Sequence, residues 1–93
     1  MKYEVRFTAQ FKRAYRRVEK QGKDMSAMRK VVGMLGEGQP LPEKHKDHPL
    51  TGRWKGFREC HVQPDWLLIY KVDRGILVLT LAHTGSHAEL FGE

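Results

Sequence analysis

The most constraining feature of this sequence is an apolar run at Trp66–Tyr70, followed after a short turn by a second one within residues 76–83. Strands that are apolar on both faces are buried on both faces, so they lie in the middle of a sheet. Asp73-Arg74-Gly75 supplies the turn between them, with Gly75 free to adopt a positive φ angle. We therefore predict antiparallel central strands at residues 65–72 and 76–83.

Residues 1–36 predict one strand and two helices. Apolar residues, Met1 among them, alternate with charged ones over residues 1–7, which is typical of a strand covered on one face. Thr8 and Asp24 are suitable N-caps for two helices. Apolar residues follow both caps at helical spacing: Phe11, Ala14, Tyr15 and Val18, then Met28, Val31, Val32 and Leu35. Two such helices form an antiparallel hairpin that can lie across a sheet.

A polar, proline-containing segment separates the helices from the remaining strands. Residues 39–52 predict a loop, residues 55–62 a further strand, and residues 87–90 a short helical turn. The predicted order is β-α-α-β-β-β. We therefore expect an α+β fold in which an antiparallel sheet packs against an N-terminal helical hairpin. The chain 1–93 is short enough to be a single domain.

The charge of the chain favours anionic partners. Its 17 Lys and Arg residues exceed its 11 Asp and Glu residues, giving a net charge of +6 and a pI near 9.7. Nucleic acid, an acidic protein or an acidic membrane surface would be attracted. Cys60 is a single cysteine, so an internal disulfide is impossible and a reducing, cytoplasmic location is expected. The first residues predict neither a signal peptide nor a membrane span.

Four residues carry the acid–base potential of the sequence. His48, His61, Asp65 and His87 lie next to predicted strand ends and are expected to meet at one end of the sheet. RNA cleavage without a metal needs a base for the 2′-hydroxyl proton, an acid for the leaving 5′ oxygen, and cations for the phosphate charge. DNA lacks the 2′-hydroxyl, so the same site would not cut DNA by this reaction. The candidate cations near the site are Lys46, Arg53, Lys55 and Arg58.

Each of these features also has another interpretation. The same four residues are acceptable zinc ligands, although no sharp ligand motif supports a metal. Trp66 fits the core better than a stacking surface, whereas Trp54 and Phe91 fit either. Cys60 is interpreted as a packing residue rather than a nucleophile. The basic face of the first helix either binds phosphates or is solvated surface, and it consists of Lys12, Arg13, Arg16, Arg17 and Lys20.

Two stretches give the chain a resemblance to a known family. KDHPLTGRWKGFRECHVQPDWLLIYK and AHTGSHAELFG resemble the YafQ branch of the RelE/ParE toxin superfamily, and the likeness extends over nearly the whole chain. The resemblance implies a RelE-like fold and a ribosome-dependent endoribonuclease toxin of a type II toxin–antitoxin pair. Such toxins inhibit translation by cutting mRNA in the ribosomal A site, leaving a 2′,3′-cyclic phosphate and a 5′-hydroxyl, without a metal or other cofactor.

The resemblance also implies roles and partners. Asp65 would be the general base and His87 the general acid, while His48 and His61 would orient the phosphate or share protons. By the same resemblance Trp66, beside this group, would be a substrate-binding residue, and Phe91 would hold a base. The implied partners are a cognate antitoxin, the 70S ribosome and mRNA, with no membrane. The alternative is a non-catalytic, ParE-like inhibitor of DNA gyrase on the same scaffold, which would not need the histidines.

Overall fold

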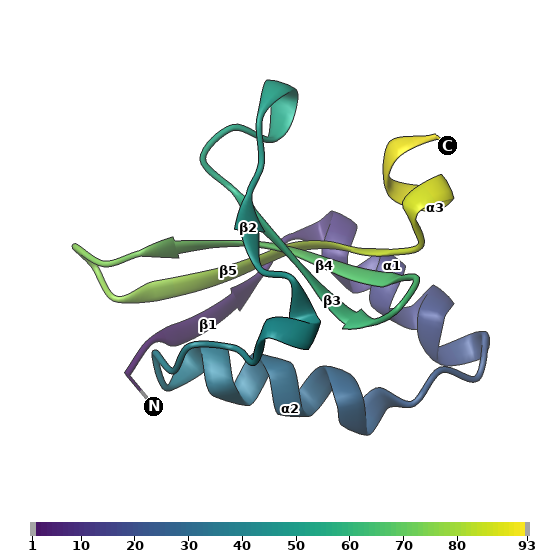
Figure 1. The fold of residues 1–93 in the computed structure, drawn as a ribbon, viewed down its shortest axis with the longest axis horizontal. Helices are drawn as coiled ribbons and strands as arrows, with labels where there is room; N and C mark the ends of the chain where they lie inside the picture. Colours follow the sequence, from purple (N-terminus) through teal and green to yellow (C-terminus); the bar gives the residue numbers. More distant parts are fainter. Residues whose placement is uncertain (1, 93) are drawn as a thin grey trace.

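The structure, a computed structural model, describes residues 2–92, and Met1, which we expected in the first strand, lies outside them. Its elements in chain order are β1 (Glu4–Phe7), α1 (Ala9–Lys20), α2 (Met25–Gly36), η1 (Glu43–His45), β2 (His48–Pro49), η2 (Gly52–Trp54), β3 (Arg58–Gln63), β4 (Trp66–Asp73), β5 (Val78–Gly85) and α3 (His87–Phe91). The five strands found there form one sheet in the order β1-β5-β4-β3-β2 (Figure 1). None of the helices within residues 2–92 is long and apolar enough to traverse a lipid bilayer.

The predicted α+β class with an N-terminal helical hairpin is confirmed, but the sheet is mixed. Strands β2 to β5 pair antiparallel, as expected from their short connections. Strand β1 instead pairs parallel to β5, with Glu4 opposite Val78. The prediction of a wholly antiparallel sheet is therefore wrong at this edge. Strand β1 thus lies beside β5 at this edge, although the helical hairpin and the strands β2, β3 and β4 separate the two in sequence.

Both helices of the hairpin begin directly after the predicted N-caps, Thr8 and Asp24. The Thr8 side chain accepts a hydrogen bond from the Phe11 N–H at 3.0 Å, and Asp24 accepts one from the Ser26 N–H at 3.1 Å. Each cap satisfies a backbone donor that the first helical turn leaves unpaired. The predicted apolar stripes bury Phe11, Val18, Met28 and Val31 among others against the sheet.

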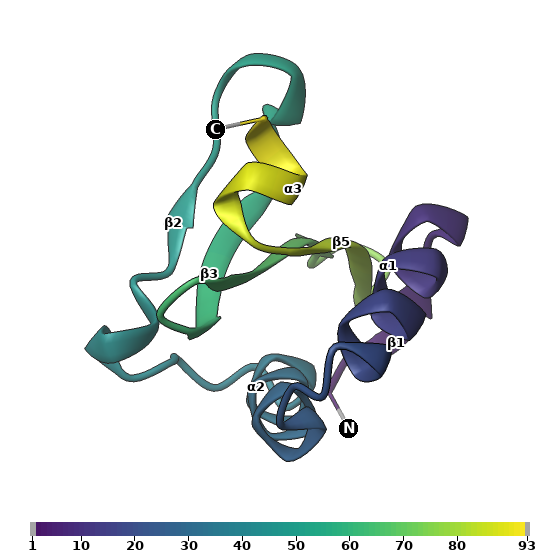
Figure 2. The same cartoon turned by 90° about the vertical axis from the view of Figure 1, so that its right-hand side faces the viewer.

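Strand β4 divides the interior into two clusters. Its residues 66–70 are all at most 1% exposed, which confirms the predicted central strand. Trp66, Leu68 and Tyr70 face the helical hairpin. Leu67 and Ile69 face the other side, where Leu90 of α3 covers them. Figure 2 shows α3 and the segment around η2 rising together on the side of the sheet away from α2. The predicted C-terminal helical turn is therefore present, and it covers the open face of the sheet.

Local details differ from the prediction in the loops. The segment expected to be an irregular loop contains the two-residue strand β2, which pairs with β3. Strand β3 begins at Arg58 because the Phe57 N–H turns back to the Trp54 carbonyl at 2.9 Å. In the β4–β5 turn the positive φ angle, 55°, belongs to Leu77 and not to Gly75. Asp73 shapes that turn, since its carboxylate accepts from the backbone N–H of Gly75 at 2.9 Å.

Candidate active site

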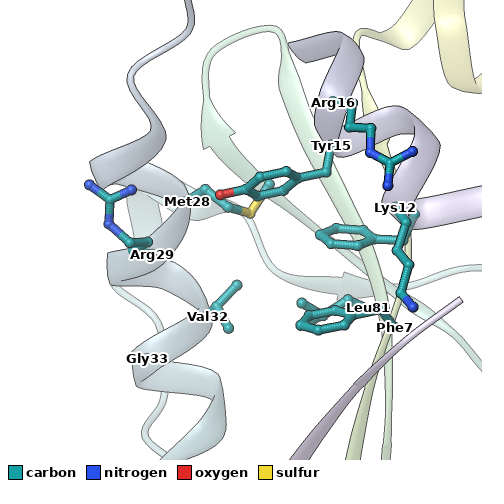
Figure 3. A pocket seen from close by; sticks show the side chains of 10 residues that line it. Phe7, Lys12, Tyr15, Arg16, Met28, Arg29, Val32, Gly33 and Leu81 are labelled. Atoms are coloured by element: carbon teal, nitrogen blue, oxygen red, sulfur yellow. The ribbon is translucent and has the colours of Figure 1, made fainter. Parts of the chain in front are cut away.

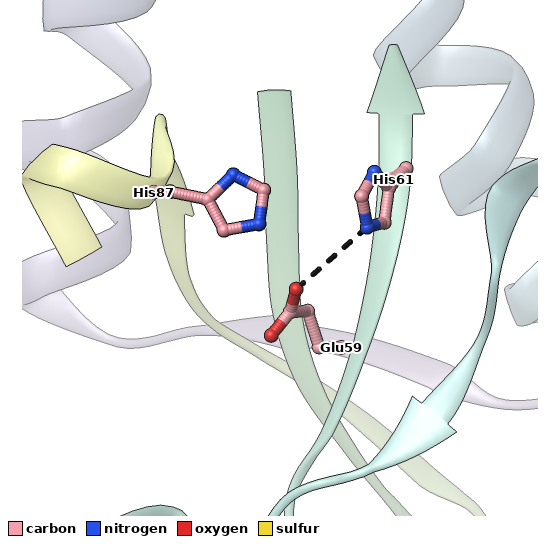
Figure 4. Close-up of side chains that lie close together, drawn as sticks. All are labelled: Glu59, His61 and His87. Atoms are coloured by element: carbon pink, nitrogen blue, oxygen red, sulfur yellow. Dashed lines mark ion pairs between the residues drawn. The ribbon is translucent and has the colours of Figure 1, made fainter. Parts of the chain in front are cut away.

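A buried carboxylate, Glu59, lies between two of the predicted histidines. Glu59 and His61 are two residues apart in β3, so their side chains share the face of the sheet opposite the helical hairpin (Figure 4). Glu59 is only 5% exposed. Its two oxygens each lie 4.0 Å from a histidine Nε2, one of His61 and one of His48. His48 reaches this position because β2 pairs it directly opposite Glu59.

Asp65 and His87 form a second pair at the same rim. Asp65 closes the β3–β4 turn and His87 begins α3. The Asp65 Oδ1 accepts two hydrogen bonds from His87, one from the ring Nδ1 at 2.8 Å and one from the backbone N–H at 3.1 Å. These bonds hold the pKa of the Asp65 carboxyl below its ordinary value, and the bond from the ring makes the larger contribution. Asp65 is therefore a carboxylate stabilised in its charged form.

The two groups meet at His61 and His87. Their ring centroids lie 5.7 Å apart in an edge-to-face arrangement. Three potential metal-ligand atoms lie within 4.8 Å of one another, one from each of Glu59, His61 and His87. The structure thus brings all four predicted residues to one rim of the sheet, with Glu59 as the member that joins His48 to the others.

Backbone carbonyls set the orientation of the histidine rings. The His61 Nδ1 donates to the Pro64 carbonyl at 3.2 Å, and the His48 Nδ1 donates to the Lys46 carbonyl at 2.7 Å. With Nδ1 protonated by this arrangement, each neutral ring presents an unprotonated Nε2 on its other side. His61, His48 and His87 therefore all use Nδ1 for anchoring and leave Nε2 for chemistry.

The predicted cations near the site do not all face it. Lys46, Arg53 and Lys55 are exposed on the segments before β3. Arg58 instead points to the opposite face from Glu59, where its Nε donates to Asp47 at 3.1 Å. Adjacent strand residues point to opposite faces, which separates Arg58 from the histidines. The prediction that Arg58 contacts substrate is therefore not retained.

The two predicted aromatic contacts also separate. Trp66 is 1% exposed, and its Nε1 donates to the Thr84 hydroxyl at 2.9 Å, so it belongs to the core and has no surface for a substrate. Its prediction as a substrate-binding residue is likewise not retained. Phe91 is 37% exposed at the end of α3. It lines a crevice of about 560 Å³ together with Arg53 and Trp54. Phe91 is thus accessible to a ligand.

The basic face of α1 has two parts. Lys12 and Arg16 line an apolar groove of about 480 Å³ between α1 and α2, with Arg29 on the opposite wall (Figure 3). Arg17 instead turns toward the active rim, where it donates to the Thr84 carbonyl at 3.2 Å and pairs with Glu89 at 3.0 Å. Arg13 and Lys20 are exposed. Arg17 is therefore held by contacts within the chain.

Sequence reasoning missed Glu59 and assigned Cys60 correctly. A glutamate next to a cysteine in a strand is ordinarily a surface residue, so its type gives no sign of burial. Its spacing does give a sign, because residues two apart in a strand point to the same face, and Glu59 precedes His61 by two. Cys60 is fully buried on the other face, and this burial raises the pKa of its thiol. It is a packing residue, as predicted.

Comparison with known proteins identifies the family. The family described as the YafQ bacterial toxin of type II toxin–antitoxin systems matches residues 3–92. The mRNA interferase toxin YafQ of Escherichia coli K12 is 40% identical over 90 residues, covering 96% of each chain. The E. coli DinJ–YafQ complex contains a chain with a TM-score of 0.88 and 40% identity, covering 97% of this chain and 99% of that one. A metal-bound toxin from Helicobacter pylori has a TM-score of 0.89 and 43% identity, covering 96% and 99%.

The fold and the site therefore define a small bacterial toxin with a histidine- and carboxylate-lined rim. The chain belongs to the YafQ family of type II toxin–antitoxin toxins.

Proposed function

We propose that this protein is an endoribonuclease toxin that cuts mRNA on the ribosome by acid–base chemistry and so inhibits translation in the cytoplasm. The observation that carries this proposal is the Asp65–His87 pair at 2.8 Å, placed next to the ring of His61. The related E. coli protein is an mRNA interferase. A non-catalytic inhibitor of gyrase would not need titratable groups directed at a common point.

His87 is the proposed general acid. The Asp65 carboxylate opposite Nδ1 stabilises the imidazolium that carries a second proton on Nε2. When the 2′ oxygen attacks phosphorus, the bond to the 5′ oxygen breaks, and the His87 Nε2 proton passes to that oxygen. The products are a 2′,3′-cyclic phosphate and a 5′-hydroxyl.

His61 is the proposed general base, in place of the Asp65 that the family resemblance implied. A carboxylate whose pKa is held below its ordinary value is a weak proton acceptor, and Asp65 is already bonded to His87. The His61 Nε2 is unprotonated in the neutral ring, and it accepts the 2′-hydroxyl proton. Glu59, 4.0 Å from that nitrogen, stabilises the resulting charge, and His48 shares it.

The cations supply attraction and transition-state charge. The exposed residues Lys46, Arg53 and Lys55, on the segments before β3, attract the scissile phosphate. Phe91 stacks on a neighbouring base. On α1, the exposed residues Lys12, Arg13, Arg16 and Lys20 contact ribosomal RNA phosphates, in keeping with the net charge of +6.

The cognate antitoxin is the proposed inhibitory partner. The related E. coli toxin forms a complex with DinJ. The groove between α1 and α2 has an apolar floor that includes Phe11 and Val32, with Lys12, Arg16 and Arg29 at its margin. An acidic segment with apolar residues, disordered until it binds, complements such a groove.

Primer extension on translated mRNA tests the proposed reaction. Wild type should cut ribosome-bound message, whereas His87→Ala and Asp65→Ala should each lose about 10²–10⁴-fold in cleavage rate. Circular dichroism should show that both variants keep the fold, because both side chains lie at the surface. Cleavage at the wild-type rate by both variants would remove the site assignment.

Metal-dependent cleavage is a second candidate, favoured by one observation. Glu59, His61 and His87 offer ligand atoms within 4.8 Å of one another, which suits a zinc-like ion with one open position. A related toxin from H. pylori is metal-bound. A metal held there would supply a Lewis acid for the phosphate. The end groups separate the two candidates, because activation of a water molecule by a metal does not leave a 2′,3′-cyclic phosphate.

A further inference from the structure

Helix α3 is too short to hold His87 in place by itself. It contains five residues, His87–Phe91, and isolated helices of this length are unstable in water. Leu90 anchors its underside by burial against Leu67 and Ile69. That contact fixes the middle of the helix, but His87 stands at its first residue. The orientation of the first turn must therefore come from other contacts.

Glu89 supplies those contacts with both of its carboxylate oxygens. Its Oε1 accepts from the Ser86 N–H at 2.8 Å, while the Ser86 hydroxyl accepts from the Glu89 N–H at 3.1 Å, which makes a reciprocal capping box. Its Oε2 pairs with the Arg17 Nε at 3.0 Å and accepts from the Gln21 side chain at 3.2 Å. One carboxylate thus closes the first turn of α3 and ties that turn to α1.

Arg17 completes the link to the sheet. Arg17 in the last turn of α1 and Gln21, its C-cap, are four residues apart and therefore present the same face to Glu89. The Arg17 guanidinium also donates to the Thr84 carbonyl at 3.2 Å, at the end of β5. The contacts pass directly over Gly85, where a Cβ would lie 2.8 Å from the Glu89 Oε1 and 3.0 Å from the Arg17 Nη2. The junction of β5, α3 and α1 is therefore built around this ion pair.

The position of His87 depends on this junction. His87 lies between the two ends of the capping box, Ser86 and Glu89. Asp65 holds both the backbone N–H and the ring Nδ1 of His87, at 3.1 and 2.8 Å. A single oxygen can accept both bonds only while the first turn of α3 keeps its present orientation. A shift of that turn would move the ring away from Asp65 and from His61.

We propose that Glu89 is a positioning residue for the acid–base site: by joining the Ser86 N–H to Arg17, it holds the first turn of α3 so that His87 stays bonded to Asp65. This inference rests on the proposed function for its kinetic consequence, but not for its structural one. It also gives Arg17 a role within the chain, in place of the RNA contact that its position in the basic helix predicted.

Substitutions at Glu89 test the proposal by kinetics. Glu89→Ala removes both contacts, whereas Glu89→Gln keeps an oxygen for the Ser86 N–H and loses the charge that pairs with Arg17. We expect kcat for cleavage of ribosome-bound mRNA to fall about tenfold or more for Ala and by less for Gln, because ångström-scale misplacement of a catalytic group has effects of this size. KM for the programmed ribosome should stay within about twofold, since substrate contacts are retained. Glu19→Gln, which removes the same charge from an exposed position on α1, should leave both constants unchanged.

Nitrogen-15 spectra of the imidazole rings give a readout independent of cleavage. In wild type, the His87 Nδ1 should remain protonated and bonded to Asp65. In Glu89→Ala, its shifts should move toward those of a freely exchanging imidazole, while the His48 and His61 rings keep theirs. If Glu89→Ala does not fold, Glu89→Gln carries both measurements. Wild-type kcat together with wild-type His87 shifts would overturn the positioning role. If wild type itself fails to cut mRNA, the proposed function fails, and the His87 spectrum alone decides the inference.

Discussion

The two faces of the sheet have the same strands but opposite tasks. On the helix-covered face, Trp66, Leu68 and Tyr70 are all at most 1% exposed beneath two amphipathic helices. On the other face, Leu67 and Ile69 are equally buried, but within residues 2–92 their cover is the short helix α3 and the segment around Trp54. Beside this thin cover lie Glu59 and the histidines. One face supplies most of the folding stability, and the other combines a smaller core with the chemistry.

Strand alternation is what allows this division. Within β3, Glu59 and His61 face the open side, while Cys60 lies in the main core between them in sequence. A one-residue change of register would exchange the two sets and bury Glu59 and His61 among apolar side chains. The register of β3 against β4, with His61 opposite Leu67, is therefore a functional feature as much as a structural one.

Leucine-to-alanine substitutions at two adjacent positions of β4 should show the largest difference between the stabilising face and the catalytic face. Leu68→Ala, on the helix-covered face, should lower the free energy of unfolding by about 2–5 kcal/mol, as a cavity in a well-packed core does. Leu67→Ala should fall at the lower end of that range, because α3 can settle into the space. Denaturant unfolding measures both. The cleavage rate per folded molecule should fall only for Leu67→Ala, which loosens the seat of Leu90; the opposite pattern would contradict the division.

Glu59→Gln should have a smaller effect, confined to chemistry. The amide keeps the volume of the buried side chain but cannot stabilise positive charge on His61 or His48. We expect the single-turnover cleavage rate to fall about tenfold, equivalent to about 1.4 kcal/mol of activation free energy. The free energy of unfolding should change by less than about 1 kcal/mol, as is usual when no cavity or unpaired charge is created. Glu43→Gln is the exposed control, and a full cleavage rate for Glu59→Gln would exclude the role of this carboxylate.

The smallest predicted effect is a change in the pKa of one group, the Asp65 carboxyl. The His87 bonds hold the pKa of Asp65 below its ordinary value of 3.8. Because the pKa is lower in the folded chain, the ionised carboxylate stabilises the fold above that ordinary value, and the contribution disappears as the pH falls through the folded pKa. His87→Ala should therefore raise the pKa of Asp65 toward 3.8, as measured by carbon-13 NMR. His48→Ala should leave it unchanged. An unmoved pKa in His87→Ala would mean that the pair does not form in solution.

The sequence predicts the covered face of this molecule better than the open one. Helix caps and apolar periodicity are local signals, so Thr8, Asp24 and the run in β4 were identified with their correct roles. The direction of β1 depends on how a distant segment crosses the sheet, which no local pattern encodes. Likewise, the positive φ angle of the β4–β5 turn belongs to Leu77, the residue after the Gly75 and Ile76 N–H groups that donate to Asp73.

The candidate site shows the same limit. The types and spacing of His61, Asp65 and His87 mark them as candidates, and the structure places them together. Charge alone does not tell which face a residue takes, so Arg58 was grouped with the histidines although it binds Asp47 on the other side. Glu59 was not predicted because residue type alone does not distinguish a buried carboxylate from an exposed one. Both assignments become available once strand alternation is counted from His61.

An mRNA with a single 2′-deoxynucleotide at the cleavage position tests whether the 2′-hydroxyl is the nucleophile. In the proposed reaction the 2′-hydroxyl of the scissile nucleotide attacks the phosphate, activated by groups on the open face of the sheet. Replacing that nucleotide by its 2′-deoxy form in a ribosome-bound mRNA should abolish cleavage at that position, while the unmodified message yields a 2′,3′-cyclic phosphate. Cleavage of the deoxy-substituted message at the normal rate would contradict attack by the 2′-hydroxyl.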